Sequence, residues 1–430
     1  MKLGVISLGC DKATVDSERL VGRLVGHGAE LEANVEESDV ILINTCGFID
    51  AAKQESIDTI LRAVELKQHG RVKAVAAVGC LIQRYRDELS REIPEVDMFL
   101  GFTDLDQLIP ELVKRGLIDP DPFAADPGTR RYLGEGPHVR YLKISEGCDH
   151  TCAFCAIPLM RGKHRSDGLA SLVAEAQQLE AQGAREINLV AQDLGHYGRD
   201  LGRDGPKLPD LLEALLAETS VPWYRLLYVY SFGITEGLVD LMASQTRIVP
   251  YIDIPIQHAS DKMLKAMRRP ERQQTIREKV NWLRREVPEI AIRSTAIVGF
   301  PGESDDDFAT LCDFVEEVGF ERLAVFTYSQ QEGTRAAALD DDVPEETKRK
   351  RQEELTEMQR LISEARLSRY VGRETDVLID EIVNPADVLE ATHVGRVKWQ
   401  ADDVDGVTYL TEGGWSRPGE MVRARLTDNE

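Results

Sequence analysis

The sequence predicts a multidomain α/β protein: an open parallel α/β domain, then a partial (β/α)6 TIM-like barrel, then a small antiparallel β-barrel. Short apolar runs alternate with helical patterns up to residue 117, which is typical of a parallel sheet covered by helices. Residues 118–137 are rich in proline, glycine and acidic residues, and the alternation restarts after them. We therefore expect domains at 1–117, 138–365 and 366–430, with a linker at 118–137.

Strands and helices alternate in the first domain. Apolar runs predict strands at residues 3–7, 40–44 and 74–78. Helical patterns are expected at 17–26, 53–68, 83–90 and 105–114. The carboxyl ends of such parallel strands lie at one edge of the sheet, where ligands of open α/β sheets bind.

The second domain repeats the alternation six times. Strands are expected at residues 140–145, 186–191, 224–230, 251–254, 292–298 and 323–328, with helices between them at, for example, 169–182, 271–285 and 305–318. Six units are fewer than the eight of a complete TIM barrel, so we expect a partial one. A charged helix follows near residues 344–370, and its charge run is typical of a solvated helix face.

The last domain has short β-like runs separated by turn residues, which predicts a small antiparallel barrel. The runs lie at residues 375–382, 393–399, 406–410 and 421–426. From Arg366 onward there are eight Lys and Arg against thirteen Asp and Glu, and the whole chain has a net charge of −23. RNA-binding modules usually carry a basic footprint, so the nucleic-acid signal is weak and a basic protein partner fits better. A local basic patch at Arg366, Arg369 and Arg373 stays open, as does a purely packing role for this domain.

The chain of 430 residues has no apolar run long enough to span a membrane, and its first residues are interpreted as a strand rather than a signal peptide. We therefore expect a cytoplasmic protein. In that compartment its seven cysteines favour metal or catalytic roles over disulfides. Cys312 lies in an apolar helical stretch and is expected in the core.

Three cysteines follow the first barrel strand within eight residues. Cys148, Cys152 and Cys155 are separated by three and two residues, so one loop can direct all three sulfurs at one iron–sulfur cluster. Three ligands leave one iron of a four-iron cluster open for chemistry. The alternative is a zinc site with His150 or His164 as fourth ligand, but no second paired half of a zinc motif lies nearby.

This motif, with Phe154 as the aromatic before the last cysteine, resembles the radical S-adenosylmethionine superfamily. The resemblance implies a [4Fe–4S] cluster whose open iron binds S-adenosylmethionine, and a 5′-deoxyadenosyl radical formed by one-electron cleavage. It implies that Phe154 lies near the adenine. Residues at other strand ends are candidates for the rest of the S-adenosylmethionine pocket: Gln192, Gln257, Gly299 and Glu303.

Three further cysteines, Cys10, Cys46 and Cys80, lie far apart in sequence, but each comes just after a predicted strand. Because parallel strands share one carboxyl edge, these cysteines can converge on a second cluster. Glycines next to them allow close backbone approach. The alternative is three inert core cysteines.

Two cysteine triads on an open α/β domain and a partial barrel resemble the methylthiotransferases, over nearly the whole chain. The motif Asn44-Thr45-Cys46-Gly47-Phe48-Ile49-Asp50 is similar to the branch that modifies an aspartate of the twelfth small-subunit ribosomal protein. The stretch Asp253-Ile254-Pro255-Ile256-Gln257-His258 points the same way. One departure is Asp11-Lys12-Ala13, where the family usually has Pro-Lys-Asn.

The resemblance implies two [4Fe–4S] clusters: a radical-forming one at Cys148, Cys152 and Cys155, and an auxiliary one at Cys10, Cys46 and Cys80 that presents sulfur. It further implies an electron donor such as flavodoxin or ferredoxin, a basic ribosomal protein as substrate and a C-terminal TRAM domain with an OB-like fold. The alternatives are methylthiolation of a transfer-RNA adenosine, a non-catalytic iron–sulfur electron carrier and a zinc-stabilised binding protein.

Overall fold

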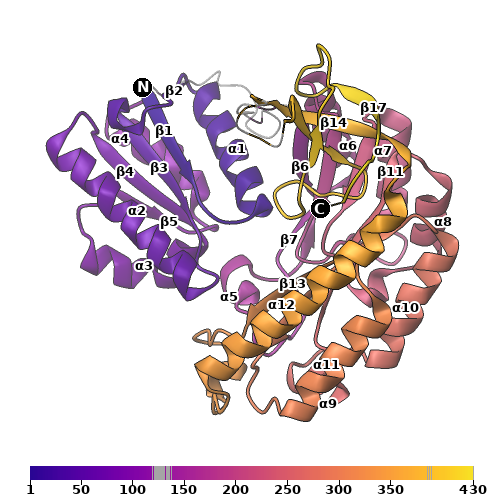
Figure 1. Ribbon diagram of the computed structural model, residues 1–430. Coiled ribbons are helices and arrows are strands. Elements are labelled where there is room, and N and C mark those ends of the chain that lie inside the picture. Colours follow the sequence, from indigo (N-terminus) through magenta and orange to yellow (C-terminus); the bar gives the residue numbers. More distant parts are fainter. Residues whose placement is uncertain are drawn as a thin grey trace. The chain divides into compact units, whose positions relative to one another are not determined.

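The computed structural model describes residues 1–118, 120, 131, 136, 138–384, 386, 388 and 390–429. These residues form two compact units (Figure 1). The first unit contains the described part of Met1–Gly134, with Ala156–Lys163 and Gln331–Gly333. The second unit contains the remainder. The linker expected at 118–137 lies mostly outside the described residues.

Five parallel strands in the order β2-β1-β3-β4-β5 form the sheet of the first unit. Their bounds are Lys2–Ser7 for β1, Glu30–Leu31 for β2, Val40–Thr45 for β3, Ala74–Gly79 for β4 and Met98–Leu100 for β5. The three long strands confirm the predicted ones. The two edge strands were not predicted, because two or three residues are too few to show a periodic pattern.

Helices cover both faces of this sheet, as expected for an open α/β domain. They are α1 (Asp11–Gly26), α2 (Asp50–His69), α3 (Cys80–Glu92) and α4 (Leu108–Lys114). Within β3, Val40 and Leu42 pack in the cluster with α1 and α4, whereas Ile41 and Ile43 pack in the cluster with α2 and α3. Burial on both faces explains why the strand sequences are continuously apolar. The short helix α5 (Ile157–Arg161) belongs to this unit and packs against α3.

A second parallel sheet, with six strands in the order β13-β12-β11-β10-β9-β6, is the centre of the second unit. The strands are β6 Val139–Lys143, β9 Glu186–Val190, β10 Trp223–Leu226, β11 Ile248–Gln257, β12 Ala291–Val298 and β13 Arg322–Thr327. Within the described residues the end strands β13 and β6 are not neighbours. The six predicted units of a partial barrel are therefore confirmed.

Helices connect these strands, and a long charged helix follows them, as predicted. Their bounds are α6 Leu169–Ala181, α7 Leu208–Glu218, α8 Glu236–Ser244, α9 Asp261–Ala266, α10 Gln273–Glu286, α11 Asp305–Val318 and α12 Glu345–Leu367. A two-stranded ribbon is formed by β7 (Ser145–Glu146) and β8 (Arg165–Ser166). The 3-10 turns are η1 Val35–Glu37, η2 Leu105–Gln107, η3 Leu194–His196, η4 Ser231–Gly233, η5 Ala336–Ala338 and η6 Ser368–Tyr370. As expected, Cys312 on α11 is buried.

An antiparallel sheet in the order β16-β15-β14-β17 ends the chain. Its strands are β14 Glu374–Ile382, β15 His393–Val397, β16 Thr408–Leu410 and β17 Met421–Arg425, close to the predicted runs. This sheet shares an apolar core with residues at the amino ends of the barrel strands, such as Trp223 and Ala291. It therefore packs at the end of the barrel opposite the carboxyl edge.

A buried ion cluster joins the antiparallel sheet to the barrel. Glu186, the first residue of β9, accepts from Arg225 Nε at 2.7 Å and from Arg396 Nη1 at 2.6 Å. Arg396 lies on β15 and also pairs with Asp380 on β14 at 2.8 Å. Glu186, Arg225 and Arg396 are almost completely buried, so the charge of Glu186 is balanced within the core by the two arginines.

The arginines that the sequence left open as a basic patch are neutralised by neighbouring acids. Arg366 and Arg369 both contact Glu321, at 2.6 and 3.1 Å. Arg373 pairs with Glu289 at 2.8 Å. Each of the three charges therefore has an acidic partner within the second unit.

None of the helices in the described part of the chain is both long enough and apolar enough to cross a membrane.

Candidate functional site

Cys10, Cys46 and Cys80 come together at the carboxyl edge of the first sheet. Cys10 precedes α1, Cys46 follows β3, and Cys80 is the first residue of α3. Their strands β1, β3 and β4 are direct neighbours in the sheet. Gly9 has a φ of +107°, and a Cβ built on it would lie 3.6 Å from the Cys46 Sγ. The turn before Cys10 thus lies close to Cys46, in a backbone conformation that favours glycine.

The three cysteines of the first triad are chemically suited to bind a positively charged metal cluster. Burial raises the pKa of the Cys46 thiol, and it raises the pKa of Cys80 to about 11. Negative charge on Cys10 adds to the rise at both thiols, through repulsion between thiolates. All three are free of disulfides. A bound metal would remove this repulsion, so the donor set fits an iron–sulfur cluster with three thiolate ligands.

Cys148, Cys152 and Cys155 lie in the loop after β7, at the carboxyl edge of the barrel sheet. Burial raises the pKa of Cys148 to about 11, and negative charge on Cys152 and Asp193 adds to the rise. The buried Tyr230 lies close enough to interact with all three sulfurs, which raise the pKa of its hydroxyl beyond the effect of burial. Arg269 Nη1 donates to the Cys152 sulfur at 3.7 Å. This set of electron-rich sulfurs fits a second cluster.

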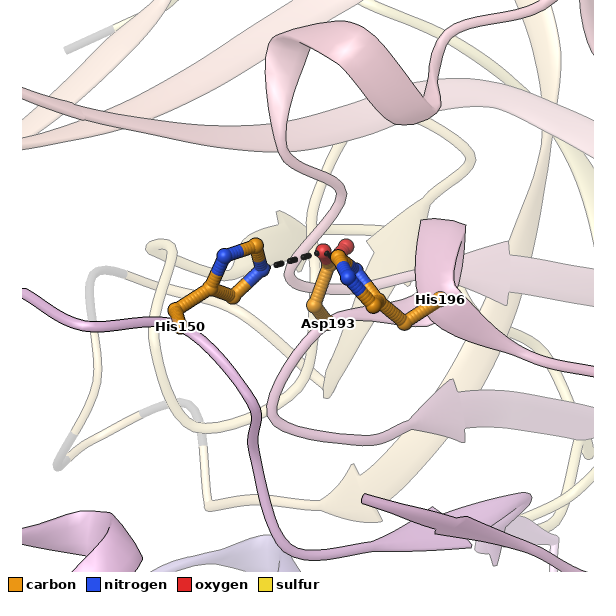
Figure 2. A group of neighbouring side chains, drawn as sticks. All are labelled: His150, Asp193 and His196. Atoms are coloured by element: carbon orange, nitrogen blue, oxygen red, sulfur yellow. Dashed lines mark hydrogen bonds and ion pairs between the residues drawn. The ribbon is translucent and has the colours of Figure 1, made fainter. Parts of the chain in front are cut away.

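His150, Asp193 and His196 form a group of neighbouring side chains (Figure 2). The group belongs beside the second triad, because His150 lies between two of its cysteines and the charge of Asp193 acts on Cys148. Asp193 follows β9, and its Oδ2 accepts from His150 Nε2 at 2.8 Å and from His196 Nδ1 at 2.5 Å. Although burial raises the pKa of the Asp193 carboxyl, the hydrogen bonds from both histidines hold it well below its usual range. The His150 ring also stacks on Tyr230, with ring centroids 4.4 Å apart. Because His150 lies between Cys148 and Cys152, this group holds the cysteine loop against β9.

The histidines of the zinc alternative are engaged elsewhere. His150 is bonded to Asp193, and His164 Nε2 lies 3.0 Å from the Ser166 hydroxyl. Burial lowers the pKa of His164. The geometry therefore gives no support to either one as a fourth ligand of the triad.

The candidate S-adenosylmethionine residues lie at the same carboxyl edge as the second triad. Gln192 follows β9, Gln257 ends β11 and Gly299 follows β12. Gln192 is 9% exposed, and its Oε1 has no hydrogen-bond partner among the described residues. Gln257 has a φ of +68°, a conformation that L side chains rarely adopt and that is frequent at ligand sites. Both observations suit a ligand site.

Phe154 and Glu303 have mainly packing and positioning contacts. Phe154 is partly buried against a cluster that includes Met263 and Phe300. The Glu303 carboxylate accepts from the Gly299 backbone N–H at 2.9 Å and from Arg351 at 2.8 Å. Glu303 thus fixes the turn at Gly299, which has a φ of +74°.

Sequence reasoning missed Arg161, Arg269 and the Asp193–His196 pair. Arg161 lies beside Cys80, and Arg269 lies beside Cys152. Asp193 directly follows Gln192 in the sequence, but nothing there marks it as the partner of His150 and His196. No local motif marks these residues, since they reach the cysteines across long stretches of sequence.

Comparison with known proteins decides the family. Residues 2–101 match the Uncharacterized protein family UPF0004, residues 142–315 the Radical SAM superfamily and residues 371–430 the TRAM domain. The ribosomal protein uS12 methylthiotransferase RimO of Geobacter sulfurreducens is 44% identical, with 100% of this chain and 96% of that protein covered. The chain belongs to the RimO methylthiotransferase family.

Other members of the RimO family match equally broadly. The protein of the same name from Aquifex aeolicus is 43% identical, covering 99% of this chain and 95% of that one. The Myxococcus xanthus protein is also 43% identical, and the match covers 99% of this chain and 89% of that one. As a RimO family member, the protein is a radical S-adenosylmethionine methylthiotransferase, as the sequence motifs predicted.

Solved structures confirm the fold class. The radical S-adenosylmethionine methyltransferase TsrM from Kitasatospora setae, with tryptophan and a S-adenosylmethionine analogue bound, has a TM-score of 0.57 at 14% identity, over 76% of this chain and 72% of that one. The cobalamin-dependent radical enzyme OxsB has a TM-score of 0.53 at 11% identity, over 84% and 56%. At these identities the likeness concerns the fold alone.

Proposed function

We propose that the protein attaches a methylthio group to the β-carbon of an aspartate in ribosomal protein uS12, using S-adenosylmethionine and two [4Fe–4S] clusters. The observation that carries this proposal is the presence of two separate cysteine triads, each at the carboxyl edge of its own parallel sheet. The uS12 substrate is the one that the names of its relatives state. The same proposal places the protein in the cytoplasm.

Each residue of the proposed site has a distinct task. Cys148, Cys152 and Cys155 hold one cluster and leave an iron open, and Cys10, Cys46 and Cys80 do the same for the other. When bound, the second-triad cluster would supply the electron that cleaves S-adenosylmethionine to the radical that removes the aspartate β-hydrogen, and the first-triad cluster would present the sulfur. A second S-adenosylmethionine molecule would supply the methyl group. Gln192 offers its unpaired Oε1 to the ligand, and Phe154 lies near the adenine. Gln257 and the Gly299 turn, held by Glu303, shape the rest of the pocket.

The domain limits of the proposal are 1–117 for the auxiliary-cluster domain, 118–137 for the linker, 138–365 for the radical domain and 366–430 for the TRAM-like domain. The acidic balance of the last segment favours a basic protein as substrate over RNA. The ion pairs of Arg366, Arg369 and Arg373 with Glu321 and Glu289 support the same choice. A reducing protein such as flavodoxin or ferredoxin would supply the electrons.

The direct test is anaerobic incubation of the reconstituted protein with S-adenosylmethionine, dithionite and either uS12 or unmodified transfer RNA. We expect 5′-deoxyadenosine together with a uS12 aspartate that is heavier by one methylthio group, as measured by mass spectrometry. Product on transfer RNA alone would overturn the proposed substrate. Absence of 5′-deoxyadenosine from a cluster-loaded sample would indicate the non-catalytic electron carrier instead.

A further inference from the structure

Each cysteine triad has one deeply buried arginine beside a ligand sulfur. Arg161 is 9% exposed and Arg269 is 3% exposed. Burying a guanidinium is costly unless its charge is matched by nearby negative groups. The groups that contact the two arginines therefore show which negative charges each guanidinium balances.

Arg161 contacts the first triad from α5, although it lies only six positions after Cys155 in the sequence. Its Nη1 is 3.0 Å from the Asp16 carboxylate of α1, and its guanidinium lies 4.5 Å from the Phe102 ring centroid. It also forms a hydrogen bond with the Cys80 side chain.

Arg269 contacts the second triad from the turn after α9. Its Nη1 donates to the Cys152 sulfur at 3.7 Å, and its Nη2 donates to Glu271 at 3.1 Å and to the Pro255 carbonyl at 2.8 Å. Its guanidinium lies 4.0 Å from the Tyr230 ring centroid.

The cysteine loop and the α9 turn that carries Arg269 are joined by their backbones. Ala153 N–H donates to the Met267 carbonyl at 2.9 Å. This main-chain hydrogen bond and the ion pair with Glu271 together hold the Arg269 guanidinium beside the Cys152 sulfur.

We propose that Arg161 and Arg269 are positioning residues that each raise the reduction potential of the one cluster beside them, Arg161 for the Cys10–Cys46–Cys80 site and Arg269 for the Cys148–Cys152–Cys155 site. The proposal rests on the proposed two-cluster function. A cation and a hydrogen bond at a ligand sulfur stabilise the reduced, more negative cluster. Ion pairs with Asp16 and Glu271 alone would not require either arginine to contact a sulfur.

The electron balance is simple. Each cluster takes up one electron from the reductant in passing from its 2+ to its 1+ state, and the arginine keeps its proton throughout. Replacing the arginine by methionine removes the charge and keeps an unbranched side chain. We expect the equilibrium constant for reduction of the adjacent cluster to fall about tenfold, a shift of about 59 mV for a one-electron couple.

The experiment uses full-length protein in which one triad is replaced by alanine, so that a single cluster is titrated with dithionite and followed by electron paramagnetic resonance. Arg161→Met should lower the potential when only the first triad is present and leave it unchanged when only the second is present. Arg269→Met should do the reverse. Arg284→Met, which removes an arginine paired with Glu321, is the matched control and should shift neither potential.

Equal shifts of both potentials in each variant, or no shift in either, would overturn the proposal. Iron content is measured on every sample. If a methionine variant fails to bind its cluster, the lysine variant decides the matter: Arg161→Lys or Arg269→Lys should restore about four irons. Failure of the lysine variant would show that arginine's shape, not its charge, is needed, and would contradict the proposal. About four irons in the unmutated protein would refute the two-cluster function itself, whereas about eight irons with unchanged potentials would refute only this inference.

Discussion

The Nε2 atom of His150 lies 2.8 Å from the Oδ2 atom of Asp193. His150 belongs to the cysteine loop, and Asp193 belongs to the end of β9, so this hydrogen bond connects the loop to the barrel sheet. The Asp193 carboxylate also accepts from His196 and from the Gly195 backbone N–H at 2.9 Å. The loop that carries the second triad is therefore tied to the end of β9 through the Asp193 carboxylate.

Asp193→Ala should loosen this loop. The change leaves several buried donors without an acceptor, which costs about 1–3 kcal/mol for each unsatisfied group. We expect less iron bound in protein that carries only the second triad, together with a lower midpoint of urea unfolding. Asp240→Ala, at an exposed position on α8, is the control and should change neither quantity. Full iron content in Asp193→Ala would show that the loop does not depend on this carboxylate.

Gln192→Leu should weaken S-adenosylmethionine binding, because it removes the buried Oε1 that lacks a partner while keeping a similar volume. Loss of one hydrogen bond of about 1 kcal/mol corresponds to a rise in Kd of about fivefold. Equilibrium dialysis of the reconstituted protein measures it. Gln177→Leu on the exposed side of α6 should leave the Kd unchanged. An unaltered Kd in Gln192→Leu would exclude this residue from the pocket.

At position 257, replacement by glycine should destabilise the protein less than replacement by alanine. Its φ of +68° is strained for any residue with a Cβ, at a cost of about 1–2 kcal/mol. Gln257→Gly should therefore have a higher free energy of unfolding than Gln257→Ala. At Gln177 in the middle of α6 the order should reverse by about 1 kcal/mol, because glycine is a poor helix former. If alanine were the more stable replacement at Gln257 as well, the positive φ at this strand end would carry no strain.

Arg396→Met should lower the free energy of unfolding more than a change that breaks an exposed ion pair. The change removes one of the two arginines that balance buried Glu186, and breaking such a group typically costs about 3–5 kcal/mol. Arg425→Met breaks the exposed pair with Glu374 and should cost at most about 1 kcal/mol. Chemical denaturation measures both. Equal effects would show that the C-terminal sheet does not depend on the Glu186 cluster.

The Glu186 cluster should also make the free energy of unfolding depend on pH, in a direction that follows from the pKa of Glu186. Burial raises the pKa of Glu186, but Arg225 and Arg396 outweigh it, so the pKa in the folded protein lies below the usual value. A carboxyl with a lowered pKa stabilises the fold above its unfolded pKa, about 4.3, and loses this contribution as the pH falls through the folded value. The stability difference between the unmutated protein and Arg396→Met should therefore shrink below about pH 4. A difference that grew on acidification would contradict this assignment.

The sequence was most informative where a strand is long and a motif is local. Strands β3 and β4 are continuous apolar runs, and Cys46 and Cys80 follow them directly, so both the sheet and the convergence of the cysteines could be foreseen. The predicted strand at 224–230 is too long: β10 ends at Leu226, because Tyr228 adopts a φ of +64° that ends the extended pairing.

Residues that act at a distance could not be foreseen. Arg161 contacts Cys80 from 81 positions along the sequence, and Arg269 contacts Cys152 from 117 positions away. Nothing in the sequence distinguishes them from the other arginines. Burial and partner identity are tertiary properties, and only the folded chain reveals them.

The most direct test of the central claim is an anaerobic count of iron and sulfide on the full-length protein and on two triple variants, Cys10/Cys46/Cys80→Ala and Cys148/Cys152/Cys155→Ala. Two four-iron clusters predict about eight irons in the unmutated protein and about four in each variant. A count of about four in the unmutated protein that is unchanged when Cys10, Cys46 and Cys80 are replaced would contradict the account.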